Sequence, residues 1–63
     1  MWTIDKVKTE LPDVSVGRTR EPWRCAGRMN AFATLYHPQT GQEINISWET
    51  LVKVLNNNRT VKL

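Results

Sequence analysis

Hydrophobic residues in the middle of the chain recur at every second position, which is the period of a β-strand. Two sets of residues show this alternation: Met29, Ala31, Ala33 and Leu35, and then Ile44, Ile46 and Trp48. The residues between the two sets have turn chemistry, because Pro38 suits an early turn position and Gly41 a later position with positive φ. The pattern therefore predicts a β-hairpin with strands at about 23–36 and 42–48.

The length of the loop determines how the two strands pair. A four-residue loop at 38–41 pairs Leu35 with Ile44 and places all the aliphatic residues on one face. A three-residue loop would mix the faces, and a two-residue loop would force Pro38 into a strand. We therefore predict the four-residue loop, with Ala33 opposite Ile46 and Ala31 opposite Trp48. The expected core face consists of Ala31, Ala33, Leu35, Ile44, Ile46 and Trp48.

Two segments outside the hairpin have the features of helices. Ser47 is a suitable N-cap for a helix at about 48–56, which carries apolar residues at helical spacing and ends in three asparagines. Thr3 similarly caps a helix at about 4–11, with Trp2 packing on Val7 and Pro12 ending the helix. A strand over residues 2–11 is the open alternative, since β-branched and aromatic residues also fit extended structure.

The remaining segments complete a small sheet. Val14 and Val16 favour a short strand, residues 17–22 have the composition of a mobile loop, and residues 23–26 extend the first hairpin strand with Gly27 as a bulge or bend. Residues 59–63 alternate again and predict a short strand at the edge of the sheet. With no repeat or linker in the sequence, residues 1–63 are expected to form a single α+β domain with a small antiparallel sheet.

Length and composition restrict the class of protein. With 63 residues, of which 40% are apolar and 24% charged, the chain has the composition of a small globular domain of marginal stability. A single cysteine, Cys25, cannot form an intrachain disulfide, which favours a reducing, cytoplasmic setting and leaves oligomerisation as a further source of stability. No apolar run is long enough to span a bilayer and no export signal is recognisable, so no membrane partner is expected.

The sequence has few of the residues that catalysis and metal binding require. One histidine and one cysteine are too few for a zinc site. Cys25 and His37 are expected at opposite ends of one strand, too far apart for a nucleophilic pair. The three glycines follow no nucleotide-binding spacing. We therefore expect no metal, no cofactor and no enzymatic activity, with Cys25 in the core and His37 exposed in the turn.

An arginine-rich stretch is the strongest functional signal on a chain of net charge +3. Arginine binds phosphates in bidentate fashion and stacks on bases. The stretch predicts a small basic DNA- or RNA-binding protein with an accessory or regulatory role. The expected contact residues are Arg18, Arg20, Trp23, Arg24 and Arg28, joined by Arg59 and Lys62 if the C-terminal strand lies nearby. A solvated or salt-bridged loop is the alternative interpretation.

The polar side of the hairpin is a second candidate surface, because Phe32 and Tyr36 alternate there with polar residues. Aromatic rings on an exposed sheet stack on unpaired bases. In the alternative, the N-terminal helix or the 13–22 segment covers Phe32 and leaves Tyr36 half exposed.

A protein-binding role is the competing functional hypothesis. Three tryptophans and several arginines are also favoured anchors of protein interfaces, and the edge of a small sheet is a further docking surface. The protein would then be a regulator or inhibitor of a larger host enzyme or complex, of viral or mobile-element origin. A homo-oligomeric role is a third option.

Overall fold

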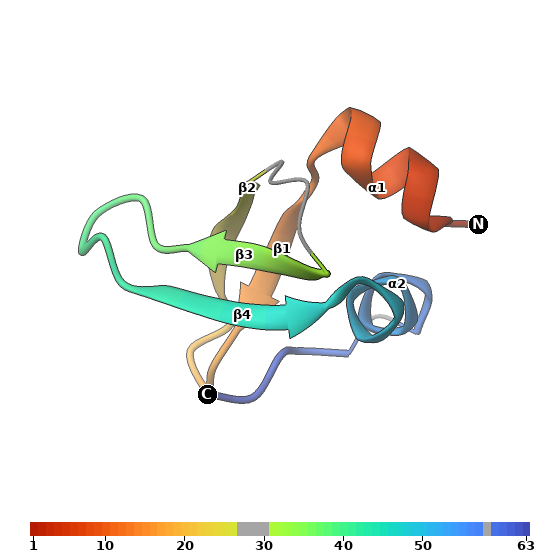
Figure 1. Cartoon of the computed structure of the whole chain (residues 1–63). Coiled ribbons are helices and arrows are strands. Elements are labelled where there is room, and N and C mark those ends of the chain that lie inside the picture. The colour runs from red at the N-terminus through yellow and green to blue at the C-terminus, as the bar shows by residue number, and fades with distance from the viewer. Residues whose placement is uncertain (27–30, 58) are drawn as a thin grey trace.

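The computed structural model describes residues 1–26, 31–57 and 59–63 (Figure 1). The elements follow in the order α1 (Ile4–Glu10), β1 (Asp13–Val16), β2 (Glu21–Ala26), β3 (Phe32–Tyr36), β4 (Glu43–Ser47) and α2 (Trp48–Asn56). The strands form one antiparallel sheet in the order β1-β2-β3-β4. Figure 1 shows both helices at the same end of this sheet. The predicted α+β fold with a small antiparallel sheet is confirmed.

Both helices begin at the predicted caps. The Thr3 hydroxyl accepts a hydrogen bond from the Lys6 N–H at 3.2 Å, and the Ser47 hydroxyl accepts one from the Thr50 N–H at 3.1 Å. Residues 4–10 are therefore helical, and the strand alternative for 2–11 is wrong. The side chain of Asn56 joins α2 to the start of the chain through two hydrogen bonds with the Trp2 backbone. In the described ranges, no helix is sufficiently long and apolar to cross a membrane.

The β3–β4 hairpin has the predicted register. Leu35 lies opposite Ile44 and Ala33 opposite Ile46, and the His37 N–H donates to the Gln42 carbonyl at 2.8 Å across the four-residue loop. The predicted pairing of Ala31 with Trp48 is wrong. Strand β4 ends at Ser47, because that residue caps α2 and Trp48 already belongs to the helix.

The predicted strand at 23–36 is two strands. Cys25 lies opposite Leu35 and Arg24 opposite Tyr36 in antiparallel register, so the chain reverses between β2 and β3. Alternation did not reveal the reversal because odd-numbered residues face the core on both strands. The bulge predicted at Gly27 lies outside the described residues.

The segment predicted as a mobile loop at 17–22 is shorter than expected. Glu21 and Pro22 already belong to β2, opposite Val16 and Ser15, and only residues 17–20 connect the strands. Pro22 is tolerated there because β2 pairs with β3 only from Arg24 onward.

One face of the sheet and the two helices enclose the core. Its buried hydrophobic residues are Val7, Val14, Val16, Trp23, Cys25, Ala33, Leu35, Trp48, Leu51 and Val61. Of the predicted core face, Ile44 and Ile46 are half-buried, and Ala31 is exposed because it precedes β3 rather than pairing within it.

The C-terminal segment, residues 59–63, runs back from α2 to the turn between β1 and β2 (Figure 1). The strand predicted here is reduced to a single parallel bridge between Val16 and Val61. The Val61 N–H donates to the Ser15 carbonyl at 3.0 Å, and the Val61 carbonyl accepts from the Gly17 N–H at 2.8 Å. With its side chain buried in the core, Val61 fixes the polar residues around it beside the β1–β2 turn.

Candidate nucleic-acid interface

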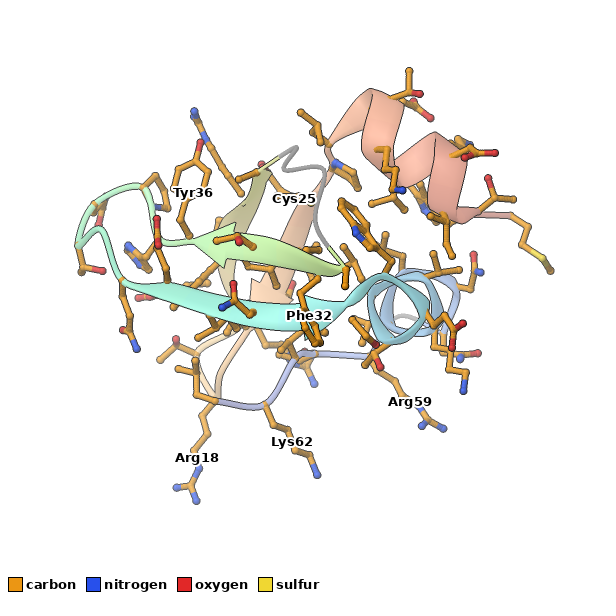
Figure 2. All side chains as sticks on the ribbon, viewed as in Figure 1. Arg18, Cys25, Phe32, Tyr36, Arg59 and Lys62 are labelled. Atoms are coloured by element: carbon orange, nitrogen blue, oxygen red, sulfur yellow. The ribbon has the colours of Figure 1, made fainter. Side chains whose placement is uncertain are left out.

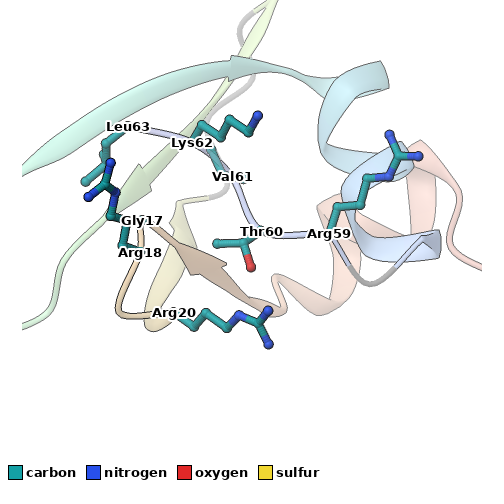
Figure 3. A pocket seen from close by; sticks show the side chains of 8 residues that line it. All are labelled: Gly17, Arg18, Arg20, Arg59, Thr60, Val61, Lys62 and Leu63. Carbon is teal, nitrogen blue, oxygen red and sulfur yellow. The ribbon is translucent and has the colours of Figure 1, made fainter.

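An open groove lies between the β1–β2 turn and the C-terminal segment (Figure 3), and we call it the basic groove. Its volume is about 1060 Å³, and it is lined by Gly17, Arg18, Arg20, Arg59, Thr60, Val61, Lys62 and Leu63. The two backbone hydrogen bonds of Val61 hold its walls together. The fold thus brings the β1–β2 turn together with the C-terminal segment, whose cations were predicted to join the basic surface only if that segment lies nearby.

The charged side chains of the basic groove are all positive. Four of its residues are cationic and exposed, and none of the described residues that line it is acidic. Within the described ranges, no acidic side chain forms an ion pair with Arg18, Arg20, Arg59 or Lys62. The positive potential is therefore directed toward solvent and attracts anions.

The lysines of α1 differ from the cations of the groove. Lys6 lies 3.8 Å from the Glu10 carboxylate and 4.8 Å from the ring centre of Trp2, and Lys8 lies 5.2 Å from the ring centre of Trp48. These charges contact other side chains of the fold. An acidic residue, Asp13, lies next to the groove, where it lines an adjoining hollow together with Arg20 and Arg59.

The four cationic side chains do not converge on one point. Figure 3 shows them distributed around the groove: Arg18 extends toward Leu63, Arg20 of the same turn extends away from it, and Arg59 and Lys62 lie on separate parts of the C-terminal segment. A single small anion would contact only part of this set. An extended polyanion that places several negative groups along the groove matches it better.

The turn that carries Arg18 and Arg20 has an unfavourable backbone conformation. Its Gly17 has φ 77°, which glycine adopts without penalty, but Arg20 also has positive φ, at 54°. A left-handed conformation costs a residue with a Cβ roughly 1–2 kcal/mol. The Arg20 N–H donates to the Gly17 carbonyl at 3.2 Å, which closes the turn. Strained residues of this kind are often found at functional sites.

The remaining arginines of the predicted cluster do not join the groove. Arg24 lies on the outer face of the sheet, in a row across all four strands with Asp13, Tyr36 and Glu43. Its neighbour on β1 is thus an acidic residue. Arg28 lies outside the described residues. The arginine-rich stretch is therefore divided, and only Arg18 and Arg20 meet Arg59 and Lys62.

Trp23, also predicted as a contact residue, belongs to the core. Its side chain is only 2% exposed, and the edge of one ring meets the face of the other in its contact with His37, with 5.5 Å between the ring centres. A ring so deeply buried cannot stack on a base, so Trp23 is not part of the accessible surface.

The aromatic residues of the outer sheet face have different exposures. Phe32 is 56% exposed, so neither α1 nor the 13–22 segment covers it, whereas Tyr36 is half-buried. Figure 2 shows Tyr36 far from Arg18, Lys62 and Arg59, which lie along the opposite side of the molecule. Tyr36 therefore does not border the basic groove.

His37 is buried, contrary to the prediction of an exposed turn residue. Its Nδ1 accepts hydrogen bonds from the Gln39 and Thr40 N–H groups, at 3.1 and 3.2 Å. The ring proton is thereby assigned to Nε2, which donates to a Glu21 carboxylate oxygen at 2.8 Å. The side chain thus links the β3–β4 turn to β2.

Cys25 lies in the core as predicted, but the distance argument against a Cys25–His37 pair was wrong. Because β2 pairs with β3, Cys25 lies opposite Leu35, near the end of the strand that leads to His37. Burial raises the pKa of the Cys25 thiol, which lowers the fraction of nucleophilic thiolate. The imidazole of His37 is already bonded to the turn and to Glu21.

No group of three His, Cys, Asp or Glu side chains within the described ranges is arranged to hold a metal ion. Comparison of the chain with models of protein families, with curated proteins and with solved structures finds no match. Among the described residues, the basic groove is the feature with the clearest binding chemistry, because its charged side chains are all cationic.

Proposed function

We propose that this small α+β protein binds nucleic acid through the basic groove and acts as an accessory or regulatory factor. The observation that carries the proposal is that Arg18, Arg20, Arg59 and Lys62 all line one groove, whose described lining contains no acidic side chain. The groove includes Arg59 and Lys62, which the sequence predicted as contact residues only if the C-terminal strand lies nearby.

The chemistry of the groove favours contacts to the phosphate backbone. Guanidinium groups bind phosphate oxygens in bidentate fashion, and the ammonium group of Lys62 adds a point charge. The hydroxyl of Thr60 is a further donor for phosphate oxygens. No aromatic side chain lines the groove within the described residues, so binding is expected to depend weakly on base sequence.

A titration of fluorescent duplex and single-stranded oligonucleotides at several salt concentrations tests the proposal. If four cations each neutralise one phosphate, the logarithm of the association constant for duplex DNA falls with a slope of about −3.6 against the logarithm of salt concentration. Single strands should give a shallower slope. The absence of binding at low salt would refute the proposal.

Matched arginine variants then locate the contact surface. Arg18→Ala and Arg59→Ala each remove one charge from the groove, so each should reduce the steepness of the salt slope by about 0.9. Arg24→Ala removes an exposed arginine of the same sequence stretch that lies outside the groove, and it should leave the slope unchanged. An equal effect of Arg24→Ala would show that the groove is not the contact surface.

A further inference from the structure

The two edges of the sheet are covered to different extents. On β1, the outer edge is joined to Val61, whereas β4 pairs on one side only, with β3, among the described strands. Natural proteins usually protect edge strands with charged side chains, most often lysine, or with proline or a bulge. Glu43, at the start of β4, is the one charged residue of this strand. Strand β4 has the sequence Glu-Ile-Asn-Ile-Ser and therefore contains neither lysine nor proline. Its edge is open to pairing with another strand.

The register identifies the backbone groups on this open edge. His37 and Gln42 form a hydrogen-bonded pair, so Leu35 with Ile44 and Ala33 with Ile46 are the next such pairs along the antiparallel ladder. In a trans peptide the N–H and C=O groups point in opposite directions. Asn45 lies between Ile44 and Ile46 on β4, so its N–H and C=O groups both point away from β3.

The C-terminal segment presents a second set of free backbone groups. The N–H of Val61 is bonded to Ser15 of β1, and its C=O is bonded to Gly17, the first residue of the turn that follows β1. By the same geometry of the trans peptide, the Thr60 carbonyl and the Lys62 N–H point away from β1. No hydrogen bond to these two groups occurs within the described ranges.

A second groove separates these two edges, and we call it the slot. It has a volume of about 540 Å³ and is lined by residues of β4, α2 and the C-terminal segment: Gln42, Ile44, Asn45, Ile46, Thr50, Val54, Arg59, Thr60, Val61, Lys62 and Leu63. Its apolar lining includes the half-buried Ile44, Ile46 and Val54. The slot thus combines an apolar lining with backbone groups available for pairing on both sides.

We propose that the slot binds an extended acidic strand of a partner protein, which pairs with β4 and with the C-terminal segment by β-augmentation. A strand has backbone donors and acceptors on both of its sides, and this matches the free groups of Asn45 on one rim and of Thr60 and Lys62 on the other. A helix would satisfy neither rim, because its backbone groups bond internally.

The lining of the slot also determines the side chains of this strand. Alternate residues that face Ile44, Ile46 and Val54 are apolar. The other residues are acidic, because Arg59 and Lys62 line the slot and no acidic side chain is among its described lining. A second copy of this chain fits less well, because its net charge of +3 would be repelled by Arg59 and Lys62 of the slot.

The slot is distinct from the basic groove. Arg59, Lys62 and their neighbours in the C-terminal segment line both, but Arg18 and Arg20 line only the basic groove, and Asn45 and Ile46 line only the slot. A partner strand in the slot does not require the arginines of the β1–β2 turn. Failure of one proposal can therefore be distinguished from failure of the other.

The test uses a synthetic peptide of alternating valine and glutamate with blocked ends, titrated into the ¹⁵N-labelled protein. Saturable binding should slow amide hydrogen exchange at Asn45 and Lys62 by about tenfold or more, because these N–H groups gain partners. A peptide N-methylated at the residues that face β4 loses donors on that side, and its affinity should fall by about tenfold or more.

Two controls separate strand pairing from general attraction between charges. A valine–lysine peptide should bind more weakly to the natural protein, and Lys62→Glu should shift the preference toward this peptide. Arg18→Ala should leave binding of the valine–glutamate peptide unchanged while it weakens binding of nucleic acid.

Three results would overturn the proposal: no saturable binding of the acidic peptide, binding without protection of Asn45, or equal binding of the N-methylated peptide. Sedimentation of the protein alone tests the second copy as occupant. A dimer that protects the Asn45 amide in the absence of peptide would also reject an acidic partner strand, because the slot would then pair with this chain itself.

Discussion

The two hairpin turns have loops of equal length but differ in what their side chains do. In the β3–β4 turn, the buried ring of His37 accepts two backbone N–H groups, and the Thr40 hydroxyl accepts a third, from Gln42 at 3.2 Å. The residue with positive φ is Gly41. In the β1–β2 turn, exposed arginines occupy two of the four positions, and Arg20 itself has positive φ.

We infer from this difference a division of tasks between the two turns, one serving stability and the other binding. The β3–β4 turn uses side chains to satisfy its own backbone, so it contributes to stability. The β1–β2 turn directs its side chains into solvent and depends on Val61 of the C-terminal segment for support. Substitutions in the two turns should therefore have different effects on stability and on binding.

Replacement of His37 should have the largest effect on stability. His37→Ala removes the acceptor for two backbone N–H groups, the bond to Glu21 and the ring contact with Trp23. We expect the free energy of unfolding to fall by about 3 kcal/mol. Urea denaturation followed by tryptophan fluorescence measures this loss. As a control, Gln39→Ala in the same turn keeps the backbone donor and should change stability by less than about 0.5 kcal/mol.

Gly41→Ala tests the backbone of the β3–β4 turn alone. A Cβ at this position meets no atom within 4 Å, but φ is 76°, so any loss reflects conformation rather than a clash. The expected loss is about 1 kcal/mol in urea denaturation. An unchanged stability would show that the positive φ is not required there.

Arg20→Gly should have the opposite effect on stability. Glycine adopts the left-handed conformation of this residue without the Cβ penalty, so the free energy of unfolding should rise by about 0.5–1 kcal/mol. The same variant should bind nucleic acid more weakly, because it removes one charge from the groove. A variant that loses both stability and binding would contradict the proposed division of tasks.

The pH dependence of stability probes the junction between the hairpins, where Cys25 of β2 lies opposite Leu35 of β3. Burial raises the pKa of this thiol in the folded protein above its ordinary value of 9.0. As the pH rises above 9, the unfolded state loses its thiol proton first, so the protein should become less stable. Denaturation at several pH values, with Cys25→Ala as the control that removes this contribution, measures this small effect.

Local features of the sequence predicted the helices and the β3–β4 register well. The caps Thr3 and Ser47 act within one helical turn, and the loop at 38–41 determines the pairing of its own neighbours. The reversal between β2 and β3 was missed because residues 23–26 and 32–36 keep the same alternation on both strands. Period alone carries no information about the direction of the chain.

Side-chain placement was predictable only where it depends on neighbours in the sequence. The burial of His37 requires Glu21 and Trp23 from another strand. The basic groove similarly requires the bridge between Val16 and Val61, which is a tertiary contact. The sequence therefore identified Arg18, Arg20, Arg59 and Lys62 as candidates, but it could not separate them from Arg24.

The single bridge at Val61 also has consequences for the order in which the molecule assembles. It closes a chain segment that contains β2, the β3–β4 hairpin and α2, so its formation costs more loop entropy than either local turn. We expect residues 59–63 to dock after the sheet has formed and to detach by local opening before the sheet unfolds. The temperature range over which the protein retains its folded sheet should therefore be wider than the range over which the basic groove and the slot exist.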